Sequence, residues 1–414
     1  MRHILITYVL EHLITWSPIP KVHQSTISSI MKPLNLSTLV IILALFSRLA
    51  AARDSYHVDH ETAAIRTYFY VGGGYSDDGN GGHIFKDQMY VEKLSPSSTR
   101  HNKYNPIVLI HGQGQTGTNF LNKPDGGKSW TSQFIEAGYT VYIVDQTFRG
   151  RSAWAPGSGA GTPSTYSAEL IQKRFTAPES YDLWPQATLH TQWPGTGMMG
   201  DPVFDAFYSS NVQFIANATY QQRTMQSASA ELLDLIDKPV WLLGHSQGGL
   251  MPLLIADVRP KLTKGLILLE PTGPPFQEAV FSSSLARQWG LTDITLNYSP
   301  PVIDPLVDLV RQVLAPANST SNTTVPCVLQ ASDPTPRQLP NLAALRILTV
   351  TGEASYHAPY DHCTVAFLQQ AGCTKAGHLE LGKVGIKGNG HMMFMEKNSE
   401  KIWEHVHEWM EVDE

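Results

Sequence analysis

The chain has 414 residues, of which 42% are hydrophobic and 16% charged, and this composition allows one large buried core rather than a string of modules. Its formal net charge of −6 and the lack of any Lys/Arg run in the sequence argue against a nucleic-acid partner. Its three cysteines exclude a disulfide-rich scaffold, because they allow either one disulfide and one remaining thiol or three unpaired thiols.

The N-terminal segment has the composition of a targeting signal. Lys32 precedes an apolar run over 39–46, and small residues occupy 50–52. This order is typical of a secretory signal peptide and predicts cleavage after Ala52. The apolar run is shorter than the ~20 residues that a membrane-spanning helix needs, so no stable membrane span is expected. We therefore expect a secreted protein, with a signal-anchored protein of the secretory pathway as the alternative.

The signal is predicted to start at Met31, which leaves 1–30 as an upstream extension and 53–414 as the mature folded domain. Sequons that fit glycosylation of surface loops in a secreted protein occur at Asn217, Asn297, Asn318 and Asn322.

The mature chain opens with two segments rich in β-branched and aromatic residues, 65–70 and 88–94. Both are predicted to be strands, and the glycine-rich stretch between them is predicted to be a flexible hairpin loop. Short apolar runs without alternation follow, as expected for strands buried on both faces of a parallel sheet: 107–110, 141–144, 240–243, 266–269 and 347–350.

Helix-like segments lie between these runs, at 129–137, 225–236 and 363–370, and an amphipathic segment over 399–412 ends the chain. Strand and helix therefore alternate, which predicts a mostly parallel, doubly wound α/β sheet.

Two connections, roughly 151–222 and 272–341, are too long for simple crossovers and are predicted to be insertions that form a lid or cap. Their large apolar side chains are candidates for the lining of a site; the alternative is that they form a small core of the insertion itself. These residues are Trp184, Trp193, Met198, Met199, Phe204 and Phe207.

The strongest chemical signal is Gly244-His245-Ser246-Gln247-Gly248, which follows an apolar strand and precedes a helix-compatible run. In this context Gly-x-Ser-x-Gly is typical of a nucleophile elbow, in which a sharp turn exposes the serine hydroxyl. Ser246 is therefore the predicted nucleophile.

A serine hydroxyl needs a base, and His391, in a glycine-flanked loop before the terminal helix, is the predicted one. The acid that orients it is Glu270 or Glu353, since each follows a predicted strand, and the strand pattern does not separate them. A metal role for His357 and His362 with Asp361 is a weaker alternative.

Acyl transfer also needs hydrogen-bond donors for the oxyanion. The backbone N–H groups of Gln247, after the nucleophile, and of Gln113, in the loop after 107–110, are the predicted donors. His111 is expected to support this loop. No metal or organic cofactor is required by this scheme.

From about residue 65 to 409 the chain resembles the α/β-hydrolase superfamily, and in particular a bacterial esterase branch whose acid is a glutamate at the end of the strand after the nucleophile helix. Glu270 stands 24 residues after Ser246, which fits the short interval of that branch. The resemblance therefore favours Glu270. The branch carries adjacent cysteines in its oxyanion loop where this chain has Gln113-Gly114, so properties that depend on those cysteines are not transferred.

The segments 352–357 and 388–393 also resemble fungal hydrolases associated with secondary metabolism. Together these resemblances imply a serine hydrolase that cleaves a small-molecule ester or lactone through an acyl-enzyme on Ser246. A non-hydrolytic cyclase or lyase on the same scaffold is the alternative. A catalytically inactive binding module is disfavoured, because both Ser246 and His391 are present. The acyl group, the alcohol and the oligomeric state are not predicted.

Overall fold

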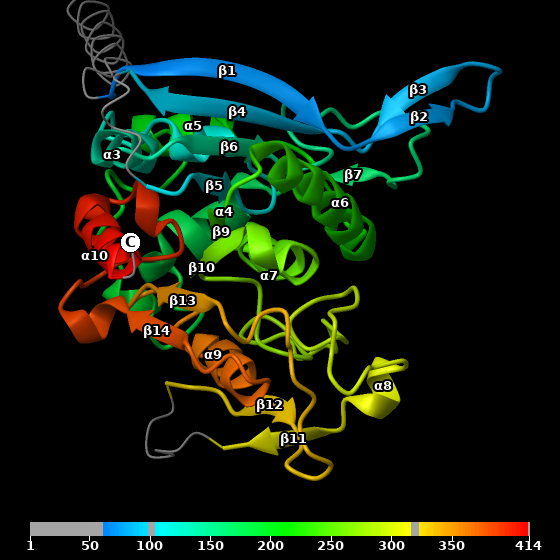
Figure 1. Cartoon of the computed structure of the whole chain (residues 1–414). Helices are drawn as coiled ribbons and strands as arrows, with labels where there is room; N and C mark the ends of the chain where they lie inside the picture. Colours follow the sequence, from blue (N-terminus) through cyan, green and yellow to red (C-terminus); the bar gives the residue numbers. More distant parts are fainter. Residues whose placement is uncertain (1–60, 98–103, 316–322, 413–414) are drawn as a thin grey trace, which may run out of the picture. The chain divides into compact units, whose positions relative to one another are not determined.

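The computed structural model describes residues 61–97, 104–315 and 323–412 (Figure 1). The predicted signal peptide and upstream extension, and the sequons at Asn318 and Asn322, lie outside these residues. Within the described ranges, no helix combines the length and apolar character needed to cross a bilayer.

The core element is an eight-stranded sheet with the strand order β1-β4-β6-β5-β9-β10-β13-β14. Strands β1 and β4 are antiparallel to their neighbours, and the pairs from β6 to β14 are parallel. The bounds are β1 Ala64–Val71, β4 Met89–Pro96, β5 Ile107–Ile110, β6 Val141–Asp145, β9 Val240–His245, β10 Thr263–Leu269, β13 Arg346–Thr351 and β14 Ala376–Glu380.

Helices cover both faces of the sheet (Figure 1): α3 Trp130–Ala137 and α10 Ser399–Glu411 lie on one face, and α6 Ala218–Ile236, α7 Gln247–Val258 and α9 Asp361–Gln370 on the other. Alternate strand residues enter two separate hydrophobic clusters. In β5, Val108 packs in the cluster with α6 and α7, whereas Leu109 packs with α3 and α10. The uninterrupted apolar runs are explained by this double burial, and the predicted doubly wound architecture is confirmed.

The glycine-rich stretch after β1 differs from its prediction. It forms a second hairpin, β2 Gly74–Asp77 and β3 His83–Lys86, whose Tyr75 and Phe85 rings meet edge to face at 5.2 Å. Asp78 closes the turn by accepting hydrogen bonds from the N–H groups of Asn80 and Gly82. The prediction of a flexible loop was wrong because this side-chain-to-backbone turn and the aromatic pair order the hairpin.

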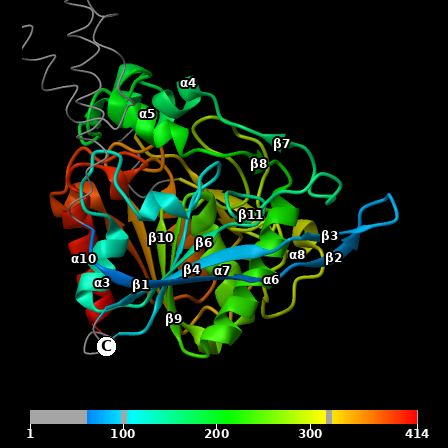
Figure 2. The same cartoon turned by 90° about the horizontal axis from the view of Figure 1, so that it is seen from above.

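The long connection after β6 carries only short elements before α6: β7 Pro163–Ser164, α4 Ala168–Ile171, the π-helical turn η4 Gln172–Thr176, η5 Pro178–Ser180, η6 Ala187–Leu189, α5 Pro202–Ser209 and β8 Phe214–Ile215. Figure 2 shows the part with α4 and α5 beyond one end of the sheet. The connection after β10 contains α8 Pro305–Asp308, β11 Arg311–Leu314 and β12 Cys327–Gln330. Further 3₁₀ turns are η3 Gly117–Phe120, η7 Pro260–Leu262, η8 Leu381–Val384 and η9 Met393–Met395.

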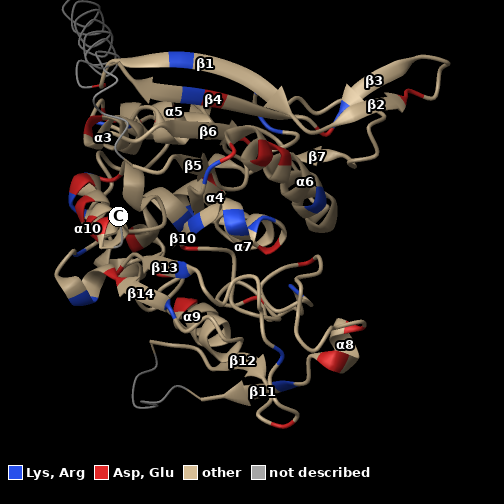
Figure 3. Cartoon of the chain, in the orientation of Figure 1, with Lys and Arg blue, Asp and Glu red and all other residues tan. Residues whose placement is uncertain are grey.

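Charged residues avoid the centre of the sheet. Figure 3 shows β5 without basic or acidic residues, whereas α10 carries both kinds. The sequences of β5 and β9 contain no Asp, Glu, Lys or Arg, as their double burial requires.

Candidate active site

Ser246 occupies a strained turn between β9 and α7. Its φ of 56° and ψ of −122° are rare for a residue with a side chain. The turn is held because the N–H of Ser246 donates to Leu269 and its carbonyl accepts from Gly249 and Thr272. A Cβ on Gly244 would lie 2.1 Å from the Gly248 oxygen, and one on Gly248 would lie 2.2 Å from the His111 oxygen. Glycine is therefore required at both ends of the turn.

The loop after β5 packs directly against this turn, as the contact between Gly248 and His111 shows. His111 is fully buried: its Nδ1 donates to the Gly112 carbonyl at 2.8 Å, and its Nε2 accepts from the Gln146 N–H at 2.9 Å. Burial lowers the pKa of His111 to about 4, so the ring is neutral and supports the loop. The Gln113 side chain accepts a hydrogen bond from the Tyr166 hydroxyl at 2.5 Å.

His391 and Glu270 meet at the carboxyl end of the sheet. The Nδ1 atom of His391 lies 2.6 Å from Oε2 of Glu270, and both side chains are buried. The same Glu270 oxygen accepts from the Ser355 hydroxyl at 2.6 Å, and its other oxygen accepts from the Gly352 N–H at 2.7 Å. The carboxylate is thus fixed by three donors, and its orientation toward His391 is determined.

Glu353, the other candidate acid, has different partners. Its oxygens bind the Lys387 ammonium group at 2.8 Å and the Gly388 N–H at 2.9 Å. It therefore supports the loop that leads to His391, whereas the imidazole itself contacts Glu270.

Burial affects the protonation of both members of the pair. Burial raises the pKa of Glu270 well above its usual value, and the charge of Asp361 acts in the same direction. Burial also lowers the pKa of His391, so the resting imidazole is neutral. With its Nδ1–H donated to Glu270, the Nε2 atom is the acceptor, and the Tyr356 hydroxyl lies 3.3 Å from it. A neutral imidazole in this orientation is able to accept a proton.

Two residues that the sequence reasoning missed, His245 and Arg149, support the site through hydrogen bonds to the segments that carry His391, Gln247 and Gly112. The ring of His245 lies 4.4 Å from that of His391, and its Nε2 donates to the His391 carbonyl at 3.0 Å. Arg149 is fully buried; its guanidinium donates to the Gln247 side chain at 2.8 Å and to the Gly112 carbonyl at 3.3 Å. Burial lowers the pKa of Arg149 to about 9. His245 lies inside the serine motif and was open to inference, whereas nothing in the sequence links Arg149 to either loop.

Ser246, Gln247, Gln113 and His391 all line one cavity of about 410 Å³. The connection after β6 contributes Tyr166, Leu170, Arg174 and Phe175 to its wall. The apolar residues predicted to line the site are not among the lining residues. Trp193, Phe204 and Phe207 are buried in the hydrophobic core, Trp184 is buried, and Met199 is exposed. Of the two alternatives, cavity lining is therefore wrong for these residues: Trp193, Phe204 and Phe207 pack in the hydrophobic core, and Met199 faces solvent.

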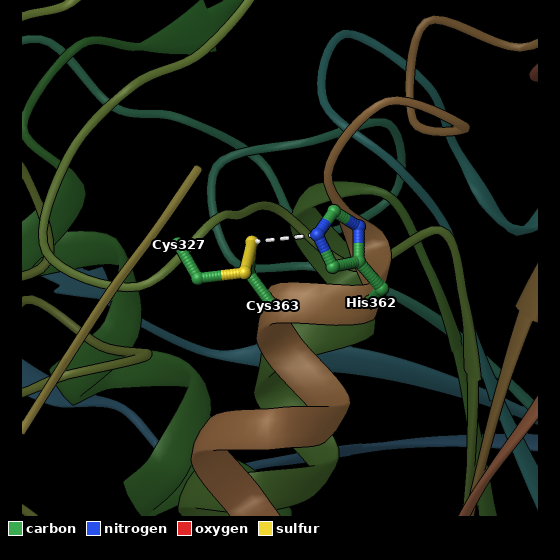
Figure 4. A group of neighbouring side chains, drawn as sticks. All are labelled: Cys327, His362 and Cys363. Atoms are coloured by element: carbon green, nitrogen blue, oxygen red, sulfur yellow. Dashed lines mark hydrogen bonds between the residues drawn. A yellow bond between two sulfur atoms is a disulfide. The ribbon is translucent and has the colours of Figure 1, made fainter. Parts of the chain in front are cut away.

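The possible metal ligands have other partners. His357 Nδ1 binds Asp361 at 2.9 Å, and its ring stacks on His391 at 5.0 Å, whereas the Nε2 atom of His362 lies 3.5 Å from the sulfur of Cys363 (Figure 4). Cys363 forms a disulfide with Cys327, so neither sulfur is a thiolate able to bind a metal beside His362. Cys373 is a buried free thiol, which confirms the option of one disulfide and one remaining cysteine.

Comparison with known proteins gives a consistent result. The alpha/beta hydrolase family model matches residues 107–404. The chain is 45% identical over 362 residues to "Probable secreted lipase phiG" from Fungal sp. (strain ATCC 74256), covering 87% of this chain and 94% of that protein. A solved structure described as a novel bacterial esterase is 21% identical to this chain and superposes with a TM-score of 0.56. The match covers 84% of this chain and 96% of that protein's chain. The expected fold is confirmed, and the chain belongs to the alpha/beta hydrolase family.

Proposed function

We propose that this protein hydrolyses a carboxylic ester or lactone through an acyl-enzyme on Ser246. One observation supports the proposal most strongly. Ser246, in its strained turn, lines the same cavity as His391, and Nδ1 of His391 lies 2.6 Å from Oε2 of Glu270. A serine with a neutral imidazole and a buried carboxylate is the arrangement that acyl transfer uses. The name of the fungal relative, a secreted lipase, supports the same class of reaction.

In the proposed reaction, Ser246 Oγ attacks the carbonyl carbon while Nε2 of His391 takes the hydroxyl proton. Glu270 stabilises the imidazolium that forms. The N–H groups of Gln113 and Gln247 donate to the oxyanion. Collapse of the intermediate expels the alcohol, which receives the proton from His391. A water molecule, deprotonated by His391, then attacks the acyl-enzyme and releases the acid and Ser246.

The test is the variant Ser246→Ala. Hydrolysis of an activated aryl ester should fall roughly 10⁴-fold, because the nucleophile is lost while the cavity is retained. Labelling by a fluorophosphonate should disappear in the same variant. Residual activity within a factor of ten of the unmodified enzyme, in a variant with an unchanged unfolding midpoint, would remove the proposal.

We also propose that the protein is secreted. The relative is named as a secreted protein, and the N-terminal pattern predicts a signal peptide that ends at Ala52. N-terminal sequencing of protein purified from the medium of a fungal host tests this, since Arg53 should be the first residue. Retention of the protein inside the cells would contradict it.

A further inference from the structure

The cavity in front of Ser246 has a cation in its wall. Arg174 lies in the π-helical turn η4, beside Phe175, and both residues line the cavity. The ring of Phe175 lies 4.8 Å from that of His391, so this turn borders the catalytic end of the cavity. Arg174 is therefore placed where a bound substrate would meet it.

The only other Asp, Glu, Lys or Arg residue among the described residues that line this cavity is Glu278. Its charge is already compensated, because its carboxylate binds Arg287 at 2.7 Å. Within the part of the chain that the structure describes, Arg174 has no hydrogen-bonded or ion-paired acceptor. The cavity thus contains one uncompensated positive charge.

The contact that Arg174 does make leaves its donors free. Its guanidinium carbon lies 3.8 Å from the centre of the Phe281 ring, a cation–π contact. Stacking occupies the flat face of the guanidinium, whereas its N–H donors project from the edge, where they match the two oxygens of a carboxylate. Phe281 also packs on Tyr356 at 5.3 Å, so the stacked pair is fixed against the loop that holds Glu270.

The positive field of Arg174 extends into the cavity. Burial raises the pKa of the Tyr166 hydroxyl, and the charges of Arg149 and Arg174 act in the opposite direction. Burial and the charge of Glu270 raise the pKa of Tyr356, and the charge of Arg174 acts in the opposite direction. Near both tyrosines, the charge of Arg174 thus lowers the cost of a negative charge.

We propose that Arg174 is a specificity-determining residue that binds a carboxylate on the substrate, so that the preferred ester or lactone carries a negative charge. This inference rests on the proposed function, because it names the substrate class of the same cavity. A guanidinium with free N–H donors in a cavity wall can bind a substrate carboxylate through two parallel hydrogen bonds.

Two pairs of esters test the proposal, each matched in size but not in charge. In the first pair, 4-acetoxybenzoate and 4-acetoxybenzamide, the charge is on the alcohol side. In the second, 4-nitrophenyl hydrogen glutarate and 4-nitrophenyl 5-amino-5-oxopentanoate, it is on the acyl side. In at least one pair, Arg174→Gln should lower kcat/KM for the anionic ester about 10- to 100-fold and leave the neutral ester nearly unchanged.

Lys173→Gln is the matched control. Lys173 is the preceding residue of the same turn, is exposed, and contacts Tyr181 instead of the cavity. The Lys173→Gln substitution removes one positive charge from the same turn and should leave the preference for the anionic ester intact. Equal loss on both members of each pair in Arg174→Gln would mean that Arg174 only supports Phe281, and would overturn the proposal, as would no change in either pair.

Binding to Ser246→Ala protein gives a second measurement that does not depend on turnover. Calorimetry with both pairs of esters should show tighter binding of the anionic member of at least one pair, and adding Arg174→Gln should abolish that difference. If the unmodified enzyme cleaves none of the esters but this binding difference is found, the proposed function fails and the anion site stands. If the esters are cleaved and bound equally well whatever their charge, the proposed function stands and the anion site fails.

Discussion

Glu270 owes its position to contacts that converge from distant parts of the chain. Its φ of 46° lies in the left-handed region, which turns the chain sharply at the end of β10. The donors that fix its carboxylate come from Gly352 and Ser355, more than 80 residues later, and from the catalytic-site candidate His391. The three donors belong to segments that other contacts also hold in place. Loss of the acid should therefore leave the protein folded, with a neutral imidazole that no carboxylate orients.

The two candidate acids make different predictions. Glu270→Gln should lower kcat by roughly 10³- to 10⁴-fold, because an amide cannot stabilise the imidazolium as a carboxylate does. Glu353→Gln should have a much smaller effect, since Glu353 binds Lys387 and the Gly388 N–H. Steady-state kinetics of both variants decide between them, with equal unfolding midpoints as the control. A larger loss in Glu353→Gln would reassign the acid.

Arg149 is expected to position the oxyanion donors without touching the substrate. It joins Gln247 to the Gly112 carbonyl, and these loops carry the two proposed N–H donors. Arg149→Met should lower kcat about 100-fold with little change in KM, because the donors shift only by a small distance from the oxyanion position.

Arg151→Met is the control for this prediction. Arg151 lies two residues away and binds Asp145 and Glu92 instead of the oxyanion loops. It should lower the unfolding midpoint while the activity of the folded enzyme stays near normal. If the two variants lose kcat to the same extent at equal folded fraction, Arg149 has only a structural role.

Among the helices and strands, the features that short stretches of sequence determine were predicted correctly. The buried strands β5, β6, β9 and β10 follow from their apolar runs, because burial on both faces favours apolar residues along the middle of each strand. The hairpin β2–β3 was missed, since its order comes from the Asp78 turn and a cross-strand aromatic pair. The serine turn is encoded in five consecutive residues. The contact of Arg149 with Gln247 joins residues 98 apart, and that of Glu270 with Gly352 joins residues 82 apart; no spacing rule in one sequence reveals them.

The disulfide joins β12 to the start of α9, across a sequence separation of 36 residues. Closing a loop of this length restricts the unfolded chain and should stabilise the fold by about 2–4 kcal/mol. Urea unfolding of the Cys327→Ser, Cys363→Ser double variant should show this loss, and reduced wild-type protein should match it.

The third cysteine serves as an internal reference. Cys373 is buried, and burial raises the pKa of its thiol to about 12, so it should resist thiol reagents until the protein unfolds. An unchanged urea midpoint in the double variant would mean that the two cysteines do not restrain the unfolded chain.

For the domain as a whole, the insertion after β6 and the loop that carries His391 are joined by an ion cluster in which His190 and Glu396 are buried. His190, from the insertion, binds Glu179 at 2.7 Å through Nδ1 and Glu396 at 2.9 Å through Nε2. Glu396 in turn accepts from the Gly390 N–H at 2.9 Å. Burial alone would lower the pKa of His190, but hydrogen bonds and charges from the two glutamates outweigh it and raise the pKa to about 9. The loop that carries His391 and the insertion are therefore coupled through a charged imidazole.

This coupling predicts a pH dependence of stability. Because the folded pKa of His190 is raised from 6.5 to about 9, its contribution is fully present below about pH 6.5 and is lost as the pH rises through 9. The contribution at low pH is up to about 3 kcal/mol. The free energy of unfolding, measured in urea at several pH values, should thus differ most between wild type and His190→Asn near pH 6 and least near pH 9.5. Arg149, whose pKa is lowered to about 9, titrates in both proteins, so subtracting the two curves removes its effect. Parallel curves across this range would show that His190 is not charged in the folded protein, and that neutral hydrogen bonds alone hold the insertion on the loop of His391.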